Sequence, residues 1–195
     1  MAFPAAPPLP EPGRRGGSER APKVFIRPAG ELDAEAIAAI YASTGTARGM
    51  LKHLWLSPDV WRERLAQDTR TARVHLVAEV VRGAWRRVVG SAAIVPVSDD
   101  PREKHVASLG IGVMDAWQGQ GVGRALMKAL LDHADHWAHH ARVELHVFAD
   151  NRRAIALYES LGFKREGTMR DSALREGGYV DSIVMGRLHP RLGEA

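Results

Sequence analysis

Short runs of apolar and β-branched residues, several of them alternating with polar residues, predict β-strands along most of the chain. The predicted strands cover residues 23–29, 74–81, 87–97, 105–113, 142–150, 163–169 and 179–188. The turn at residues 82–85 joins the second and third of them as an antiparallel hairpin. In the strand 142–150, the side chains divide between two faces. One face carries Val143, Leu145 and Val147, and the other carries Glu144, His146 and Phe148.

A period near 3.6 residues predicts helices between these strands. They cover residues 31–45, 58–67, about 121–140 and 151–162. Gly45 and Gly162 are predicted helix stops, and Pro58 stands in a first turn. Residues 44–56 are predicted to form a loop, and the charged run 164–171 an exposed turn. The order β-α-α-β-β-β-α-β-α-β-β predicts an α/β fold, with helices packed on a mixed sheet.

The length and composition are those of a single globular domain. Residues 1–22 are rich in Pro, Gly and Arg, so we expect a disordered leader there and a folded domain over residues 23–190. No stretch reaches the ~20 apolar residues of a membrane span, and the leader lacks the apolar core of a secretory signal. The chain has no cysteine, which excludes disulfides and thiolate chemistry and is compatible with a reducing cytoplasm. The net charge of +4 suits a small anionic ligand, and no stacking motif favours nucleic acid.

Three glycines, Gly119, Gly121 and Gly123, stand where the third helix is predicted to begin. A helix N-terminus offers about four unpaired N–H groups and a partial positive charge, both of which favour phosphate oxygens. Glycine allows a close backbone approach and positive φ angles, and Arg124 can add a charged contact. The glycines fit either a pyrophosphate site or a plain strand-to-helix turn, and alone they do not decide between the two.

Spacing excludes two common nucleotide motifs. A Walker loop needs Lys-Ser/Thr after its last glycine, and no such pair follows Gly123. A dinucleotide fingerprint needs Gly-x-Gly-x-x-Gly early in a parallel βαβ unit. Here the spacing is Gly-x-Gly-x-Gly, and the preceding strands are predicted to be mostly antiparallel. A different phosphate ligand is therefore indicated.

The spacing Gln118-x-x-Gly121-x-Gly123 resembles the acyl-CoA loop, Gln/Arg-x-x-Gly-x-Gly/Ala, of the GNAT superfamily of N-acetyltransferases. The segment VFADNRRAIALYESLGF is similar to the family's second cofactor block, in which Asn151 opens a helix and Tyr158 follows seven residues later. The resemblance covers roughly residues 23–188 and implies the GNAT fold, a twisted, mostly antiparallel sheet of about seven strands flanked by about four helices. HVASLGIGV, VFADN and ALREGGYVDSIVM look most like the YhhY-like branch, which acetylates free L-amino acids.

The resemblance implies that acetyl-CoA is the co-substrate, that a small amine accepts the acetyl group, and that no metal takes part. It implies cofactor contacts from Ile111, Gly112, Val113, Gln118, Gly119, Gln120, Gly121, Val122, Gly123, Arg124, Asn151 and Tyr158. The N–H of Val113 would polarise the acetyl carbonyl. Tyr158 would donate a hydrogen bond to the departing thiolate, because a tyrosine (pKa ~10) is a weaker acid than a thiol (pKa ~8.5). A purely packing role for Tyr158 is the alternative, since it shares a helical face with apolar neighbours.

His146 is the candidate base. It stands where the family's ribosomal-protein branch carries a catalytic glutamate, and histidine accepts protons near neutral pH. A structural role for His146 and proton removal through ordered water remain open alternatives. Ala107 replaces a glutamate that other branches often carry, and His105 is a further candidate.

Two other segments invite a functional interpretation. Residues 49–56, GMLKHLWL, are either a packed connection or an apolar wall of the acceptor pocket, beside which Arg48 or Lys52 could meet a substrate carboxylate. His133, His136 and His140 are predicted on one helix flank. Because no carboxylate or cysteine completes a ligand set there, we interpret the flank as solvated and predict no metal site.

These observations favour a cytoplasmic, homodimeric, acetyl-CoA-dependent N-acetyltransferase that acts on a free L-amino acid. One alternative is a protein N-terminal acetyltransferase of the ribosomal-protein type, which needs an open groove for a peptide. Another is a non-catalytic acyl-CoA-binding module. Neither nucleic acid nor a membrane is an expected partner.

Overall fold

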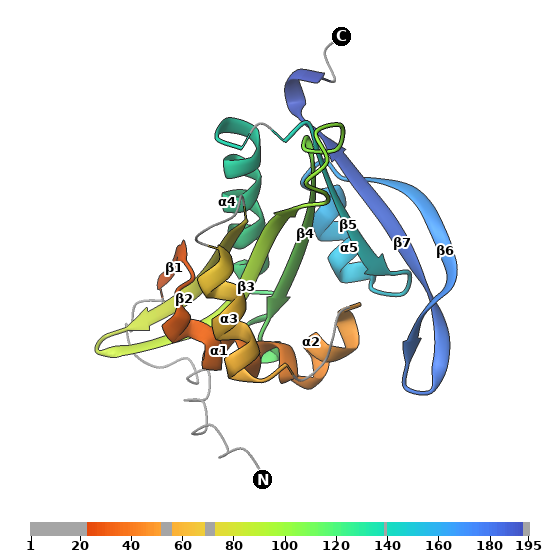
Figure 1. The fold of residues 1–195 in the computed structure, drawn as a ribbon. Coiled ribbons are helices and arrows are strands. Elements are labelled where there is room, and N and C mark those ends of the chain that lie inside the picture. The colour runs from red at the N-terminus through yellow and green to blue at the C-terminus, as the bar shows by residue number, and fades with distance from the viewer. Residues whose placement is uncertain (1–22, 52–55, 69–72, 139, 193–195) are drawn as a thin grey trace.

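The computed structural model describes residues 23–51, 56–68, 73–138 and 140–192. The predicted leader, residues 1–22, lies outside the described residues, as do Lys52, Leu54 and Trp55. The described strands form one seven-stranded sheet in the order β1-β2-β3-β4-β5-β7-β6 (Figure 1). Their bounds are β1 Lys23–Pro28, β2 Val74–Arg82, β3 Trp85–Pro96, β4 Val106–Val113, β5 Arg142–Phe148, β6 Lys164–Arg175 and β7 Gly178–Leu188. Neighbouring strands are antiparallel except β4 and β5, which are parallel.

Helices lie on both faces of this sheet. The α-helices are α1 Ala34–Ala42, α2 Thr44–Gly49, α3 Pro58–Asp68, α4 Val122–His136 and α5 Arg152–Glu159, and short 3₁₀ turns are η1 Glu31–Asp33, η2 Asp115–Trp117 and η3 Pro190–Leu192. One buried cluster joins α4 and α5 to the sheet through residues such as Leu126, Leu130 and Leu145. A second cluster joins α1 and α3 to the opposite face through Ile37 and Leu65. The predicted α/β fold is therefore confirmed.

The region after the first helix differs from the prediction. The helix α1 ends at Ala42, and Ser43 is extended with φ −67° and ψ 139°. The expected loop 44–56 is wrong in its first half, because residues 44–49 form α2. Gly45, predicted as a helix stop, lies inside α2. Two glycines in six residues disfavour a helix locally, so contacts from elsewhere in the chain must stabilise it.

Two further predictions were wrong at their boundaries. The charged run 164–171, expected to be an exposed turn, belongs to the strand β6, in agreement with the overlapping prediction of a strand over residues 163–169. Almost every residue of this edge strand is exposed, so its charges reflect solvent on both faces and not a turn. The helix α4 ends at His136, where the N–H of Trp137 bonds the carbonyl of His133, and not near residue 140.

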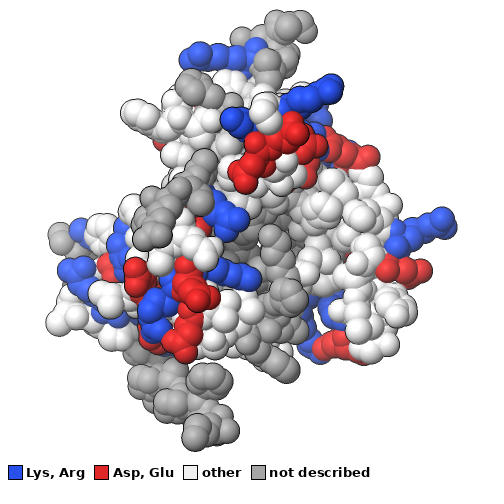
Figure 2. Space-filling model, in the orientation of Figure 1, with Lys and Arg blue, Asp and Glu red and all other residues white. Residues whose placement is uncertain are grey.

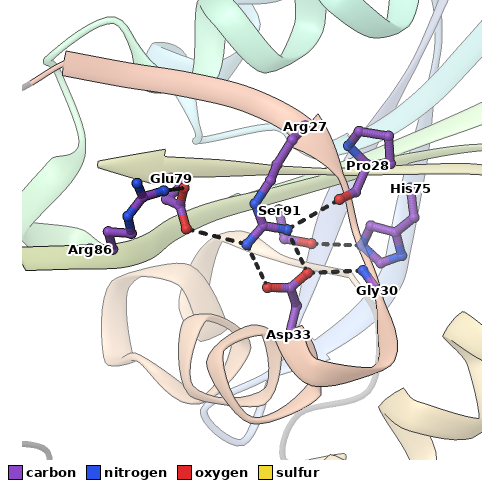
Figure 3. Close-up of polar contacts among 8 residues, drawn as sticks. All are labelled: Arg27, Pro28, Gly30, Asp33, His75, Glu79, Arg86 and Ser91. Carbon is purple, nitrogen blue, oxygen red and sulfur yellow. Dashed lines mark hydrogen bonds and ion pairs between the residues drawn. The ribbon is translucent and has the colours of Figure 1, made fainter. Parts of the chain in front are cut away.

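A polar cluster fixes β1 to the start of α1 (Figure 3). Arg27 donates two hydrogen bonds to the Asp33 carboxylate, at 2.8 and 2.9 Å, and the Gly30 N–H donates a third at 2.9 Å. Burial opposes ionisation of Asp33, but these hydrogen bonds together lower its pKa. Beside them, His75 Nε2 and Ser91 Oγ lie 2.7 Å apart in the interior. The cluster orders the entry to the helices on this face.

The surface of this face carries mixed charge. Figure 2 shows blue and red side chains interleaved over α1 and α3. Arg62 on α3 pairs there with Glu35 on α1, at 2.6 Å, and with Asp59 in its own helix, at 2.5 Å. Such exposed pairs contribute about 0–1 kcal/mol each. Positive and negative charges therefore largely balance over this part of the surface.

Candidate active site

The parallel strands β4 and β5 pair only at one end. Their register joins residues 106–108 to residues 142–144 and then stops, and Figure 1 shows the two strands diverging beyond that point. The N–H of Met114 bonds the carbonyl of Val89 on β3. Because backbone groups alternate in direction along a strand, those of Ile111 and Val113 point away from β3, toward the gap. The divergence therefore presents strand backbone to a ligand.

One of these backbone groups is already occupied. The carbonyl of Val113 accepts a hydrogen bond from Thr46 Oγ1 at 2.8 Å and another from Gln118 Nε2 at 3.0 Å. The N–H of Val113 and both backbone groups of Ile111 have no hydrogen-bond partner within the part of the chain that the structure describes, so they remain for a ligand on this edge. Gly112, between them, must be glycine for packing reasons, because a Cβ there would lie 2.7 Å from the ring of Tyr41.

The glycine turn has the predicted conformation at two positions. Gly119 has φ +78° and Gly121 has φ +85°, in the left-handed region that favours glycine. Gly121 is the N-cap of α4, so the helix begins where the sequence indicated. A Cβ at Gly121 would meet no atom within 4 Å, so this position requires glycine for its backbone angles and not for space within the protein.

Gly123 differs from the other two glycines, because its backbone does not have the predicted positive φ angle. It lies inside α4, and a Cβ there would make only an ordinary contact, 3.5 Å from Leu157. Neither strain nor crowding within the protein demands glycine at this position. Any requirement for Gly123 would come from a ligand lying on the first turn of α4.

The cleft beside this turn has a volume of about 480 Å³ and contains most of the predicted cofactor residues. Ten of the twelve line it: Ile111, Gly112, Val113, Gln118, Gly119, Gly121, Gly123, Arg124, Asn151 and Tyr158. The other two do not. The side chain of Val122 is buried in the core, and Gln120 Nε2 bonds the carbonyl of Ala116 at 2.7 Å. We name the space beside the turn the turn cleft.

A second cleft, of about 680 Å³, lies between β4, β5, α2 and the β6–β7 hairpin. We name it the hairpin cleft. Much of its wall is apolar, with Met50, Leu109, Phe148, Met169 and Leu174 among the lining residues. The two clefts share part of their lining, namely Arg48, Gly49, Met50, Ile111, Tyr158 and Arg175. They therefore meet beside Ile111 and Tyr158.

Tyr158 lies on α5 and is buried, with 8% of its surface exposed. Its hydroxyl forms no hydrogen bond with any of the described residues. Burial, with a smaller effect from Tyr41, raises the pKa of Tyr158 to about 12. Its ring packs 6.1 Å from that of Phe163. The residue thus packs in the core and also offers a neutral, unpaired donor where the clefts meet.

The candidate bases are separated by the structure. His146 is exposed on β5 and lines the hairpin cleft. The predicted division of β5 is confirmed for its buried face, Val143, Leu145 and Val147, although Phe148 on the other face is buried too. His105 is exposed and lines neither cleft. Ala107 is fully buried in the core.

The sequence prediction missed three cleft residues. Arg153 reaches over the turn, with Nη1 donating to Gln118 Oε1 at 3.2 Å and Nη2 lying 3.0 Å from a Cβ placed on Gly119. Arg175 pairs with Asp150 and lies 4.6 Å from the ring centroid of Phe148. Arg153 adjoins Asn151 in sequence, which is a signal that could have marked it. Thr46 gives no comparable sequence signal, because its role depends on a carbonyl far along the chain.

The turn cleft is electropositive. Arg48, Arg124, Arg153 and Arg175 line it, against the single carboxylate of Asp150. The pair with Arg175 lowers the pKa of that carboxylate. With unpaired N–H groups at the start of α4 and left-handed glycines before it, this lining fits a polyanionic ligand such as the phosphates of coenzyme A.

The predicted histidine flank is wrong for one residue. His133 and His136 lie on α4, but His140 follows the end of the helix and is buried, with 5% of its surface exposed. Burial, followed by the charge of His133, lowers the pKa of His140. Over the described parts of the chain, no three His, Cys, Asp or Glu side chains gather as a metal site would require. In the same residues, no helix has the length and apolar character needed to cross a bilayer.

Three comparisons relate this architecture to known proteins. A sequence model described as "Acetyltransferase (GNAT) family" matches residues 35–163. The chain is 40% identical over 166 residues to the L-amino acid N-acetyltransferase AaaT of Escherichia coli K12, covering 85% of this chain and 98% of that protein. A crystal structure of the ribosomal-protein-alanine N-acetyltransferase from Brucella melitensis aligns with TM-score 0.74 and 27% identity, over 84% of this chain and 99% of that one.

A further comparison concerns the fold alone. A phosphinothricin acetyltransferase from Sinorhizobium meliloti, solved in complex with acetyl-CoA, aligns with TM-score 0.77 at 21% identity. The alignment covers 85% of this chain and 88% of that one.

Proposed function

This chain belongs to the GNAT family of acetyltransferases and is an acetyl-CoA-dependent N-acetyltransferase, and we propose that its acceptor is the α-amino group of a free L-amino acid. The observation that carries the proposal is the meeting of two clefts at Ile111 and Tyr158. One cleft has the electropositive glycine turn, and the other has a largely apolar wall. An acyl donor in the first and an amine in the second would react where they meet.

The proposed acetyl-CoA site is the turn cleft. The phosphates would bind the N–H groups around Gly121 and the guanidinium groups of Arg124 and Arg153, because within the described residues these two arginines of the lining have no carboxylate partner. The backbone of Ile111 and the N–H of Val113 would hold the remainder of the molecule against β4. When bound, acetyl-CoA supplies the activated acyl group, and the chain supplies position and charge stabilisation.

The chemistry requires three changes at the meeting point. The acceptor amine must lose a proton, its nitrogen must attack the thioester carbonyl carbon, and the carbon–sulfur bond must break. The Val113 N–H would stabilise negative charge on the carbonyl oxygen. The Tyr158 hydroxyl would donate a hydrogen bond to the departing sulfur. With its pKa at about 12, complete proton transfer to a thiolate of ordinary basicity would be uphill by about 5 kcal/mol.

We assign proton removal from the acceptor to His146 or to water beside it. His146 supports this assignment because it is exposed on β5 and lines the hairpin cleft, where the amine would enter. Its neighbours in the lining include Ser108 and Ser182, which can hold water. A proton accepted there has a short route to solvent.

Arg48 is the proposed partner of the acceptor carboxylate. It lines both clefts, and its Nε donates to Glu176 Oε1 at 2.6 Å across the mouth of the hairpin cleft. Both members of this pair are exposed, so a substrate carboxylate can replace Glu176 at little cost. Arg175, the other arginine that lines the hairpin cleft, is already paired with Asp150. The link from α2 to the hairpin turn also favours a small acceptor over a peptide, although the ribosomal-protein enzyme from Brucella melitensis shares the fold.

The proposal is tested by following CoA release while L-amino acids, their carboxamides, polyamines and short peptides are offered as acceptors. We expect turnover with a subset of L-amino acids and a higher KM for the matching carboxamides. Arg48→Gln should raise KM for the amino acid about tenfold and leave KM for its carboxamide unchanged. Turnover restricted to peptides beginning with alanine would replace this proposal with N-terminal acetylation of proteins.

The proposal also includes a homodimer in the cytoplasm. The exposed edge strand β6 and its hairpin carry Met169, Leu174 and Tyr179, apolar or aromatic side chains that a second copy could cover. The absence of cysteine is compatible with a reducing compartment. Light scattering of the purified chain tests the dimer, and a mass of one chain, about 21.3 kDa, would remove it from the proposal.

A further inference from the structure

The helix α2 forms one wall of both clefts, yet little apolar packing supports it. It has six residues, and Thr46 is the one buried among them. An isolated helix of that length is unstable in water, because nucleation costs more than so few hydrogen bonds return. Residues 44–50 nevertheless line the turn cleft, the hairpin cleft or both. Its position must therefore depend on specific polar contacts.

The carboxylate of Asp115 supplies most of those contacts at the start of α2. Its oxygens accept from the N–H of Gly45 at 2.8 Å and from the N–H of Thr46 at 3.1 Å. Ser43 Oγ also lies 3.4 Å from Oδ1, although the shorter contact of this hydroxyl is its hydrogen bond to the Ile40 carbonyl, at 2.8 Å. This is the arrangement of a helix N-cap, except that the capping side chain comes from a segment about 70 residues later. Gly45 is adapted to it, since a Cβ there would lie 2.6 Å from Asp115 Oδ1.

Asp115 also contacts the glycine turn. It follows β4 in η2 and precedes Gln118, whose Nε2 bonds both the Val113 carbonyl and Asp115 Oδ1, at 3.0 and 3.3 Å. Arg153 donates to the other end of the same amide. The Val113 carbonyl in turn receives Thr46 Oγ1 from α2. One short ring of hydrogen bonds thus joins the glycine turn, the end of β4 and the helix α2, which forms a wall of the hairpin cleft.

We propose that Asp115 is a positioning residue that couples the two substrate sites. When phosphates occupy the turn, Gln118 and Asp115 are held in place, and the capped α2 is held with them. Acceptor affinity then depends on acetyl-CoA, and by thermodynamic linkage the reverse dependence is equal. The identity of the two ligands rests on the proposed function, whereas the coupling rests on the contacts of Asp115.

Hydrogen–deuterium exchange tests the coupling without reference to any acceptor. We expect acetyl-CoA to slow exchange in peptides spanning residues 43–50 of the wild-type chain. Asp115→Asn keeps the shape but removes the charge and one acceptor oxygen, and should abolish most of that protection while protection at the turn persists. Asp100→Asn is the matched control, because Asp100 accepts a local N–H bond from Arg102 in another loop. Equal protection of α2 in wild type and Asp115→Asn would overturn the proposal.

Steady-state kinetics provide a second, independent test. Asp115→Asn and Gly45→Ala, which change the two sides of the same contact, should each raise the acceptor KM at saturating acetyl-CoA about tenfold, whereas the Kd of acetyl-CoA measured without acceptor should change less than threefold. A merely destabilising change would lower the melting temperature and the active fraction without this split. Unchanged acceptor KM in both variants would refute the coupling. Absence of amino-acid turnover in the wild type would refute the proposed function instead, and the exchange result would still decide the role of Asp115.

Discussion

Replacing Tyr158 with phenylalanine tests the proposed chemistry with little disturbance of the fold. The substitution removes one hydroxyl and keeps the ring that packs against Phe163. Because the hydroxyl has no hydrogen-bond partner within the described residues, its loss leaves no protein group unpaired. We therefore expect the free energy of unfolding to change by less than about 0.5 kcal/mol.

The effect on catalysis should be much larger. A hydrogen bond to a charged group is worth about 1.5–3 kcal/mol, and each 1.36 kcal/mol of barrier is a factor of ten in rate. If the hydroxyl stabilises the departing thiolate, kcat should fall about 10- to 150-fold. The KM for acetyl-CoA should change little, because the interaction forms as the carbon–sulfur bond breaks.

The assay is continuous detection of the released CoA thiol at saturating acceptor, with acetyl-CoA varied. Tyr179→Phe is the matched control, since Tyr179 is 73% exposed on β7 and lines neither cleft. The raised pKa of Tyr158 adds a second expectation. An acid with a raised pKa keeps its proton to higher pH, so Tyr158 should cause no loss of wild-type activity below about pH 11. A Tyr158→Phe enzyme with unchanged kcat would remove the hydroxyl from the mechanism.

Three further predictions follow from other parts of the structure. Gly121→Ala should destabilise the fold by about 1–2 kcal/mol because residue 121 has a left-handed backbone, whereas Gly123→Ala should not destabilise it. Calorimetry of unfolding compares the two variants, and equal losses of stability would contradict the different roles of the two glycines. His146→Ala should remove the acidic limb of the pH–rate profile, and a retained limb would assign proton removal to water or another group. The lowered pKa of Asp33 means that its contribution to stability is present above the unfolded pKa and is lost as pH falls. Wild type should therefore lose more stability than Asp33→Asn between about pH 5 and 3, and parallel losses would refute that assignment.

The parts of the site that the sequence predicted are those whose conformation is set locally. Gly121 shows this most clearly: a glycine just before a helical pattern is needed for φ +85°, and that requirement is visible in sequence. The buried face of β5 followed likewise from alternation. The resemblance pointed to Tyr158 through its distance from Asn151, and Asn151 does open that helix, because its side chain accepts the N–H of Ala154 at 3.1 Å.

The parts that were missed depend on contacts between distant segments. Thr44–Gly49 has a loop-like composition, and nothing local predicts that a carboxylate at position 115 will cap it. The strand β6 was predicted only over residues 163–169, and its charged run was also interpreted as a turn, because a strand exposed on both faces lacks an apolar alternation. Arg48 and Glu176, 128 positions apart, face each other only because α2 and the hairpin approach across the cleft.

The incomplete pairing of β4 and β5 has a consequence for the behaviour of the protein among its neighbours. An open strand edge adheres to any other extended backbone, which is why exposed edges promote aggregation. The edge at Ile111 lies inside the sheet, between two strands that are joined at residues 106–108. A strand of another protein could pair with this edge only by entering between β4 and β5, whereas the edge strand β6 has no described strand on its outer side. The divergence thus leaves unpaired strand backbone for a small ligand at a position that is less accessible to another protein than the edge of a sheet.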